Sequence, residues 1–204
     1  EAEDIARIFP TRKKWDPERE RWTLRLLFDR RARNGRERHL YGASRRLPHG
    51  CCFCDVILEE HEELLFDVSD LECYFYTFQV TAAHAKRNCF GEAFPAECFQ
   101  HLKCFDPAMA GKRVVPALAT LAMGNRNAVD WAQEGHRTLL VRAGALDPAC
   151  EVVYREPMPR GKTLQALMID DRAEIAIVSG SAAGRAAVAH ADASWDAAME
   201  AYAA

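Results

Sequence analysis

The chain has 204 residues, of which 49% are hydrophobic, and a formal net charge of −3 at pH 7. A chain of this size can bury a core but is too short for several full-sized domains, and its apolar runs are far shorter than the roughly 20 residues that span a bilayer. No basic-then-apolar start marks a secretory signal, so the eight cysteines are expected to be free thiols of an intracellular protein with no membrane partner.

The charge is unevenly distributed along the chain. Residues 1–50 hold 14 Lys or Arg and 8 Asp or Glu, whereas the other 154 residues hold 13 and 22. Basic side chains can meet the phosphates of a nucleic acid, and clustered carboxylates can work beside metal cations. Ordinary solvated surface charge is the alternative explanation of this asymmetry.

The first half of the chain contains two predicted strands. Residues 1–23 are polar and carry two prolines that interrupt any long helix. A strand is expected over Trp22–Phe28, and a second over Leu64–Val68 runs into Asp70. Residues 85–112 mix Cys, Phe, Gly and Pro, which indicates an irregular, Cys-rich insertion.

Two helices are expected in the second half. Apolar residues fall at helical spacing from Val129 to Leu140, and Gly144 would end that helix. The Ala-rich tail over residues 192–204 is typical of a helix. On one face of this helix lie the side chains of Trp195, Met199 and Tyr202, which are expected to pack in the core.

A β-hairpin with two carboxylates at its tip is expected between these helices. Its strands are Leu164–Ile169 and Ile175–Val178, and the carboxylates are Asp170 and Asp171. Adjacent like charges repel, and a divalent cation is the usual remedy. Asp70, at the end of another strand, could join them around a pair of hard cations of the kind that clamps a phosphoryl transfer. A polar turn without metal is the alternative.

Four sequence blocks, in their usual order, resemble the reverse transcriptases. The run RLLFDRRARN at residues 25–34 is similar to the fingers motif R-x3-D-x-R-x2-N, and DLECYF at residues 70–75 is similar to motif A. The run LAMG at residues 121–124 resembles the start of motif B, and MIDD at residues 168–171 resembles the Y-x-D-D of motif C. The resemblance covers about three-quarters of the chain.

The resemblance implies an α+β fold. It would be a polymerase palm, an antiparallel sheet backed by helices, with partial fingers. Residues 1–63 would form a fingers-like basic segment, and residues 64–204 a palm-like catalytic segment that contains the Cys-rich insertion. The family continues to a thumb beyond the point that matches Ala204, so we expect the thumb to be absent.

The resemblance also implies roles for individual residues. Asp70, Asp170 and Asp171 would be the catalytic residues and would ligate Mg²⁺ or Mn²⁺. Phe75 would be the steric gate that excludes a ribose 2′-hydroxyl, which favours deoxynucleotides. The full set of implied nucleotide-binding residues is Arg25, Arg31, Phe75, Gly124 and Gln133.

The predicted function is that of a retroelement-type RNA-directed DNA polymerase, a nucleotidyltransferase whose partners are an RNA template, a DNA primer and dNTPs. A non-catalytic, degenerate nucleic-acid-binding domain of the same fold is the alternative. A third interpretation is a zinc-stabilised interaction module within residues 49–104. Its candidate ligands form two sets, Cys89, Cys98, His101 and Cys104, and His49, Cys51, Cys52 and Cys54.

Overall fold

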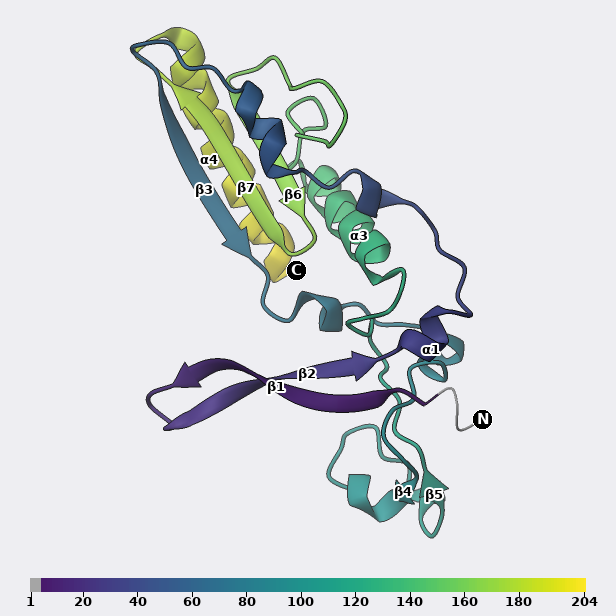
Figure 1. The fold of residues 1–204 in the computed structure, drawn as a ribbon. Coiled ribbons are helices and arrows are strands. Elements are labelled where there is room, and N and C mark those ends of the chain that lie inside the picture. Colours follow the sequence, from purple (N-terminus) through teal and green to yellow (C-terminus); the bar gives the residue numbers. More distant parts are fainter. Residues whose placement is uncertain (1–4) are drawn as a thin grey trace. The chain divides into compact units, whose positions relative to one another are not determined.

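Residues 5–204 are described by the computed structural model of the chain, and they form a mixed α+β fold (Figure 1). The expected α+β class is therefore confirmed. The chain divides into two compact units, each built from two stretches of sequence. Unit 1 comprises residues 1–39 and 75–128, and unit 2 comprises residues 40–74 and 129–204. The first four residues of the expected fingers-like segment lie outside the described part.

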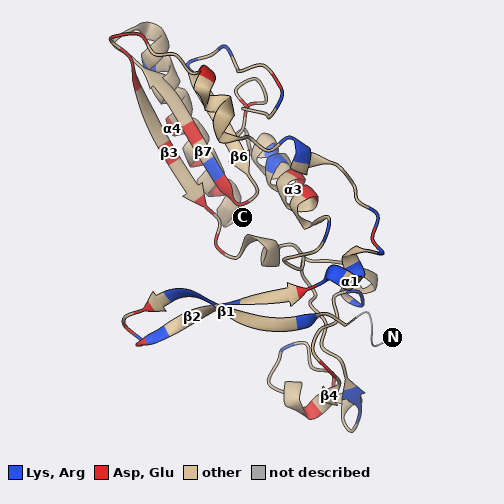
Figure 2. Cartoon of the chain, in the orientation of Figure 1, with Lys and Arg blue, Asp and Glu red and all other residues tan. Residues whose placement is uncertain are grey.

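Unit 1 begins with an antiparallel ribbon of β1 (Arg7–Asp16) and β2 (Arg21–Asp29). β2 contains the strand predicted from the sequence. β1 was not predicted, because its clustered basic residues and Pro10 hide the apolar alternation of a strand; proline is tolerated at a sheet edge, where it removes no ladder hydrogen bond. The ribbon is mostly exposed as far as Phe28, which is buried. Figure 2 shows Lys and Arg along both strands.

The rest of unit 1 is built from short elements joined by loops. This agrees with the irregular structure expected over residues 85–112. The helical segments of one turn or so are α1 (Arg31–Asn34), η4 (Tyr74–Thr77, at the boundary of the units), α2 (Ala82–Ala85), η5 (Ala96–Phe99) and η6 (Pro107–Met109). A two-residue antiparallel pair joins β4 (Phe94–Pro95) to β5 (Arg113–Val114).

Unit 2 contains a three-stranded antiparallel sheet of β3 (Glu63–Asp70), β6 (Thr163–Met168) and β7 (Asp171–Val178), in the order β3-β7-β6. β6 and β7 form the predicted hairpin. β7 begins earlier than expected, at Asp171, so only Ile169 and Asp170 form the turn. The side chain of Asp171 is consequently fixed by strand geometry.

Two long helices belong to unit 2. α3 (Ala128–Ala143) agrees with the predicted helix, and Gly144 follows it with φ +73°. α4 (Ala182–Ala203) starts ten residues before the predicted start at residue 192, where Ser181 caps it by accepting a hydrogen bond from the Gly184 amide. Alanine-rich helix starts carry little apolar periodicity, which explains the error.

The core of unit 2 lies on both faces of the sheet. On one face, Ala176 of β7 packs against Ala187 and Ala191 of α4 (Figure 1). On the other, Leu164 and Ile175 pack with residues of the short helical segment η3 (Gly50–Asp55). A third cluster joins α3, β6 and α4 through Leu140, Ala145, Leu146, Leu167 and Ala198. The remaining short segment is η2 (Ala43–Arg45).

The compact units differ from the segments expected from the sequence. Residues 40–63, which were expected to belong to the fingers-like segment, lie in unit 2, and residues 75–128 lie in unit 1. The functional boundary near residue 63 stays a prediction. Within residues 5–204, no helix is both long and apolar enough to cross a bilayer.

Candidate functional site

The three predicted catalytic aspartates lie together at one end of the unit 2 sheet. Asp70 ends β3 and is the register partner of Asp171, which begins β7, while Asp170 is in the turn between β6 and β7. The Leu71 amide donates to the Asp170 carbonyl at 3.1 Å and ties the end of β3 to the turn. One carboxylate oxygen from each aspartate lies within 4.8 Å of the others.

Close approach of the carboxylates has an electrostatic cost. Partial burial raises the pKa of Asp171, and the neighbouring charges of Asp170 and Asp70 raise it further. A divalent cation among the three would reverse this effect, because it favours the charged carboxylates. A set of donors made only of carboxylate oxygens suits Mg²⁺ or Mn²⁺. The residues present therefore fit the expected metal.

The turn that carries Asp170 has a strained backbone. Ile169 has φ +62°, in the left-handed region that a β-branched residue rarely adopts. Gln133 of α3 holds the turn from both sides: its amide nitrogen donates to the Leu167 carbonyl at 2.9 Å, and its amide oxygen accepts from the Ile169 amide at 2.6 Å. Gln133 is only 4% exposed, so these contacts fix the turn in a dry environment.

His136, one helical turn after Gln133, holds the same turn. Its Nδ1 lies 2.7 Å from the Ile169 carbonyl, and its Nε2 lies 2.7 Å from the Tyr202 hydroxyl of α4. A carbonyl oxygen only accepts, so Nδ1 carries the proton and Nε2 accepts from Tyr202. His136 is fully buried, and burial lowers its pKa. The neutral ring thereby links both helices to the turn.

A buried polar cluster supports β7 on the side facing α4. Glu174 accepts hydrogen bonds from Arg172, from Gln165 of β6 and from Ser194 of α4, at 2.7 Å for Ser194. Arg172 and Glu174 are each 1% exposed, and burial raises the pKa of Glu174. Removal of one partner would leave a buried charge unpaired, so the cluster helps to set the register of the strand that begins at Asp171.

Two of the predicted nucleotide-binding residues meet in unit 1. Gly124 and Arg31 line a cavity of about 420 Å³ together with Phe9 and Leu27 of the ribbon. Arg31 is held by two hydrogen bonds to Asp29, at 2.9 and 2.7 Å, and these bonds lower the pKa of Asp29 to about 2. The guanidinium is 90% exposed, so it can still meet an anionic ligand.

The fingers-like block and the motif B block are joined by hydrogen bonds within unit 1. The Asn34 side chain donates to the Gly124 carbonyl at 2.9 Å and accepts from the Arg126 amide at 3.1 Å. Gly124 has φ +92°, and a Cβ there would lie 3.2 Å from the Phe28 carbonyl. The positive φ and the lack of room for a Cβ atom both favour glycine at this position.

The other predicted nucleotide-binding residues lie elsewhere. Arg25 is exposed on β2, opposite Thr11 of β1, and does not line the cavity that contains Gly124. Phe75 is half-buried in η4 and belongs to unit 1, and its role as a steric gate stays a prediction. Gln133 belongs to unit 2, where the turn engages both ends of its amide, so its placement indicates a positioning role.

Sequence reasoning missed His136, Tyr202 and Asn34 as site residues. His136 lies three positions after Gln133, on the same helix face, which is the one local signal that could have connected it to the turn. Tyr202 was interpreted as core packing, and nothing near it in the sequence indicates a hydrogen bond to His136. Asn34 was recognised only as part of the fingers-like motif.

Neither predicted zinc set forms a metal cluster within residues 5–204. The cysteines of both sets are free thiols. Apart from the aspartates, the described group with metal-binding potential is that of Glu59, His61 and Glu62. Glu62 is engaged by Lys162 at 2.5 Å.

Comparison with known proteins assigns no family: no family model and no curated protein matches the chain.

Proposed function

We propose that the chain carries the metal centre of a reverse-transcriptase-like nucleotidyltransferase that extends a DNA primer on an RNA template. The observation that carries this proposal is the convergence of Asp70, Asp170 and Asp171 at the end of the unit 2 sheet. Its second support is the clamp on the turn, since α3 and α4 stabilise a strained backbone of the kind that concentrates at functional sites. The assignment of the fold as a polymerase palm belongs to the same proposal.

The three aspartates would hold Mg²⁺ or Mn²⁺ through their carboxylate oxygens. When bound, such ions supply activation of a hydroxyl nucleophile and neutralisation of phosphate charge. Gln133 and His136 keep the Asp170 carboxylate in place by fixing the turn on either side of Ile169. Gathering the ligands in advance would lower the reorganisation energy of the reaction.

Within unit 1, a nucleotide would bind in the cavity beside Gly124. The cavity beside Gly124 is within the size range of small-molecule sites, about 300–1,000 Å³. Arg31, oriented by Asp29, would pair with phosphate oxygens, and the bare Gly124 backbone allows close approach. Asn34 would keep the Gly124 loop in position, since it bonds to both sides of that loop.

Primer extension tests the proposal. The wild-type chain should extend a labelled DNA primer on an RNA template with dNTPs and Mg²⁺. Asp170→Asn should lower the rate by roughly 100-fold or more, which is the scale of losing a group that stabilises a transition state. Asp196→Asn, an exposed aspartate on α4, is the matched control and should keep the wild-type rate.

The opposite outcome is also informative. Equal rates for Asp170→Asn and wild type would contradict the assignment of the aspartates. Binding of primer–template without extension by the wild type would instead favour the non-catalytic alternative, a degenerate nucleic-acid-binding domain.

A further inference from the structure

A cavity in unit 2 adjoins the candidate metal centre and has no role in the proposed nucleotidyl transfer. Its volume is about 630 Å³, and it is lined by Ser44, Arg45 and residues 47–49, by Tyr154 and Arg155 of the connector after α3, and by Met168. Met168 is the register partner of Asp171 in the β6–β7 hairpin. One of the residues that line the cavity is therefore paired directly with one of the aspartates. Its size suits a ligand, since small-molecule sites span about 300–1,000 Å³.

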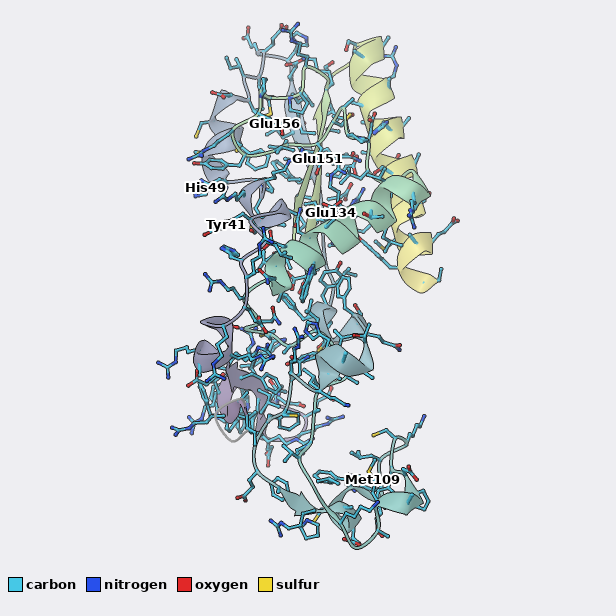
Figure 3. The ribbon with its side chains drawn as sticks, turned by 90° about the vertical axis from the view of Figure 1, so that its right-hand side faces the viewer. Tyr41, His49, Met109, Glu134, Glu151 and Glu156 are labelled. Atoms are coloured by element: carbon cyan, nitrogen blue, oxygen red, sulfur yellow. The ribbon has the colours of Figure 1, made fainter. Side chains whose placement is uncertain are left out.

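Two arginines of this cavity are held against tyrosine rings. The guanidinium carbon of Arg45 lies 4.2 Å from the centre of the Tyr41 ring, and that of Arg155 lies 5.1 Å from the centre of the Tyr154 ring. Figure 3 labels Tyr41 in this part of unit 2. Such cation–π contacts fix the direction of a guanidinium while leaving its N–H groups able to bind an anion.

Nearby carboxylates do not cancel these positive charges. Glu156 pairs with Arg46 at 3.2 Å, and Glu151 pairs with Arg137 of α3 at 2.8 Å (both glutamates are labelled in Figure 3). Among residues 5–204, neither of these glutamates forms an ion pair with Arg45 or with Arg155. The cavity consequently presents a net positive wall beside a negative metal centre.

The walls of the cavity are held by the surrounding fold. Asp130 of α3 accepts hydrogen bonds from the amides of Gly42 and Ser44, at 2.8 and 3.0 Å, and thus anchors the loop that carries Arg45. Arg155 has φ +66°, an uncommon conformation for a residue other than glycine, of the kind that concentrates at ligand sites. Both arginines are therefore placed before a ligand arrives.

We infer that this cavity binds the phosphodiester backbone of a nucleic-acid strand next to the aspartates. Arg45 and Arg155 each contact a phosphate. The rings of His49 and Tyr154, whose centres are 6.1 Å apart and whose planes are tilted by 47°, offer an aromatic surface to a base or ribose. An acidic peptide would match the charge but not the aromatic surface. The identification of the strand as the one that reacts at the aspartates rests on the proposed function, whereas the binding itself does not.

Salt-dependent binding tests this inference. A fluorescein-labelled DNA–RNA primer–template is titrated with the full chain in EDTA, by anisotropy, at several salt concentrations. The double variant Arg45→Gln/Arg155→Gln should bind roughly 10- to 100-fold more weakly at 0.1 M salt, and its slope of log K against log[salt] should be about 2 smaller, because two arginines no longer meet phosphates. Arg142→Gln, an exposed arginine of α3 outside the cavity, is the matched control and should keep the wild-type slope.

Further measurements distinguish a loss of charge from a loss of folding, and a nucleic acid from an acidic peptide as the ligand. Arg45→Lys/Arg155→Lys should restore the slope, because lysine keeps the phosphate contact, and it serves as the folded reference if the glutamine variant melts early. An unchanged slope in the glutamine variant, while it remains folded, would overturn the inference. Competition by a polyglutamate peptide as effective as that by the oligonucleotide would also overturn it, in favour of a protein ligand.

The proposed function and the cavity can fail separately. The wild-type chain should bind the primer–template in EDTA, since the cavity needs no metal. Wild-type binding without primer extension would support the cavity and contradict the catalytic proposal. Extension by the wild type together with an unchanged salt slope in the glutamine variant would support the catalytic proposal and contradict the binding role of the cavity.

Discussion

At the scale of single residues, a few buried polar side chains decide the geometry of the metal centre. His136 and Gln133 have almost no exposed surface, yet every polar atom of both side chains is used by the β6–β7 turn or by Tyr202. Such groups are costly to bury without partners, so each partner is fixed by the other. The left-handed Ile169 persists because its amide and its carbonyl are both bound.

His136 should make the stability of the protein depend on pH. Its pKa in the folded chain is lowered by burial, so between that value and the ordinary value of 6.5 the unfolded chain binds more protons. The stabilisation is complete above pH 6.5 and is lost as the pH falls through the lowered pKa. Urea denaturation at pH 7.5 and pH 5.5 should show a smaller drop in unfolding free energy for His136→Gln than for the wild type.

The exposed His61 provides the control for this measurement. His61→Gln removes a histidine whose side chain is 66% exposed, so it controls for the loss of a histidine outside the core. An identical drop in His136→Gln and in the wild type would mean that His136 is not the group that titrates.

At the scale of elements, connections distant in sequence hold the functional segments. In unit 1, the loop at Gly124 approaches the end of β2 so closely that a methyl group would press on the Phe28 carbonyl. Asn34 of α1 then bonds to the same loop. In unit 2, α3 holds the hairpin turn in a comparable way. The loop at Gly124 and the β6–β7 turn are thus each held by a segment distant in sequence and not by their own local structure.

Substitution of Gly124 should measure the cost of this close approach. Gly124→Ala should lower the unfolding free energy by about 1–3 kcal/mol, because alanine is strained at φ +92° and its methyl group would also meet the Phe28 carbonyl. Gly111→Ala is the matched control in unit 1, since φ is +74° and nothing lies within 4 Å of the added carbon. The loss of unfolded-state entropy is the same in both, so the difference reports the contact with β2. Equal losses in urea denaturation would contradict this account.

At the scale of the whole molecule, the predicted functions are distributed between the two units. Unit 2 holds the aspartates, the clamp on the turn and the cationic cavity, while unit 1 holds the exposed ribbon and the cavity beside Gly124. The charge asymmetry of the sequence follows this division in part, because the basic ribbon belongs to unit 1 (Figure 2).

Thermal melting with Mg²⁺ should reveal whether the aspartates bind a cation. At a Mg²⁺ concentration ten times its Kd, the native state should gain about 1.4 kcal/mol, and the melting temperature should rise accordingly. The gain arises because the cation favours the charged carboxylates, whereas burial and the neighbouring charges of Asp170 and Asp70 raise the pKa of Asp171. Asp170→Asn should lose most of the rise, whereas Asp196→Asn should keep it. A rise of equal size in Asp170→Asn would indicate that the cation binds elsewhere.

The sequence by itself determined the strand that ends at Asp70, the β6–β7 hairpin and the helix that follows Gly124, while the α+β class was implied by the family resemblance. These features depend on apolar periodicity and turn residues, which act over a few positions and can be read locally. Only the tertiary structure decided that Asp171 pairs with Asp70, because the register of two strands separated by about 100 residues is set by burial of the whole sheet.

The same reason explains the residues that the sequence did not indicate. The contacts of His136 with Tyr202, of Asn34 with Gly124 and of Asp130 with Gly42 each join side chains to groups more than 60 residues away. Hydrogen bonds of this kind exist only once packing has brought the elements together, and they leave no periodic signal in the chain. The three aspartates and Gln133 could therefore be named from the sequence, but the contacts that hold the aspartates in place could be found only in the folded structure.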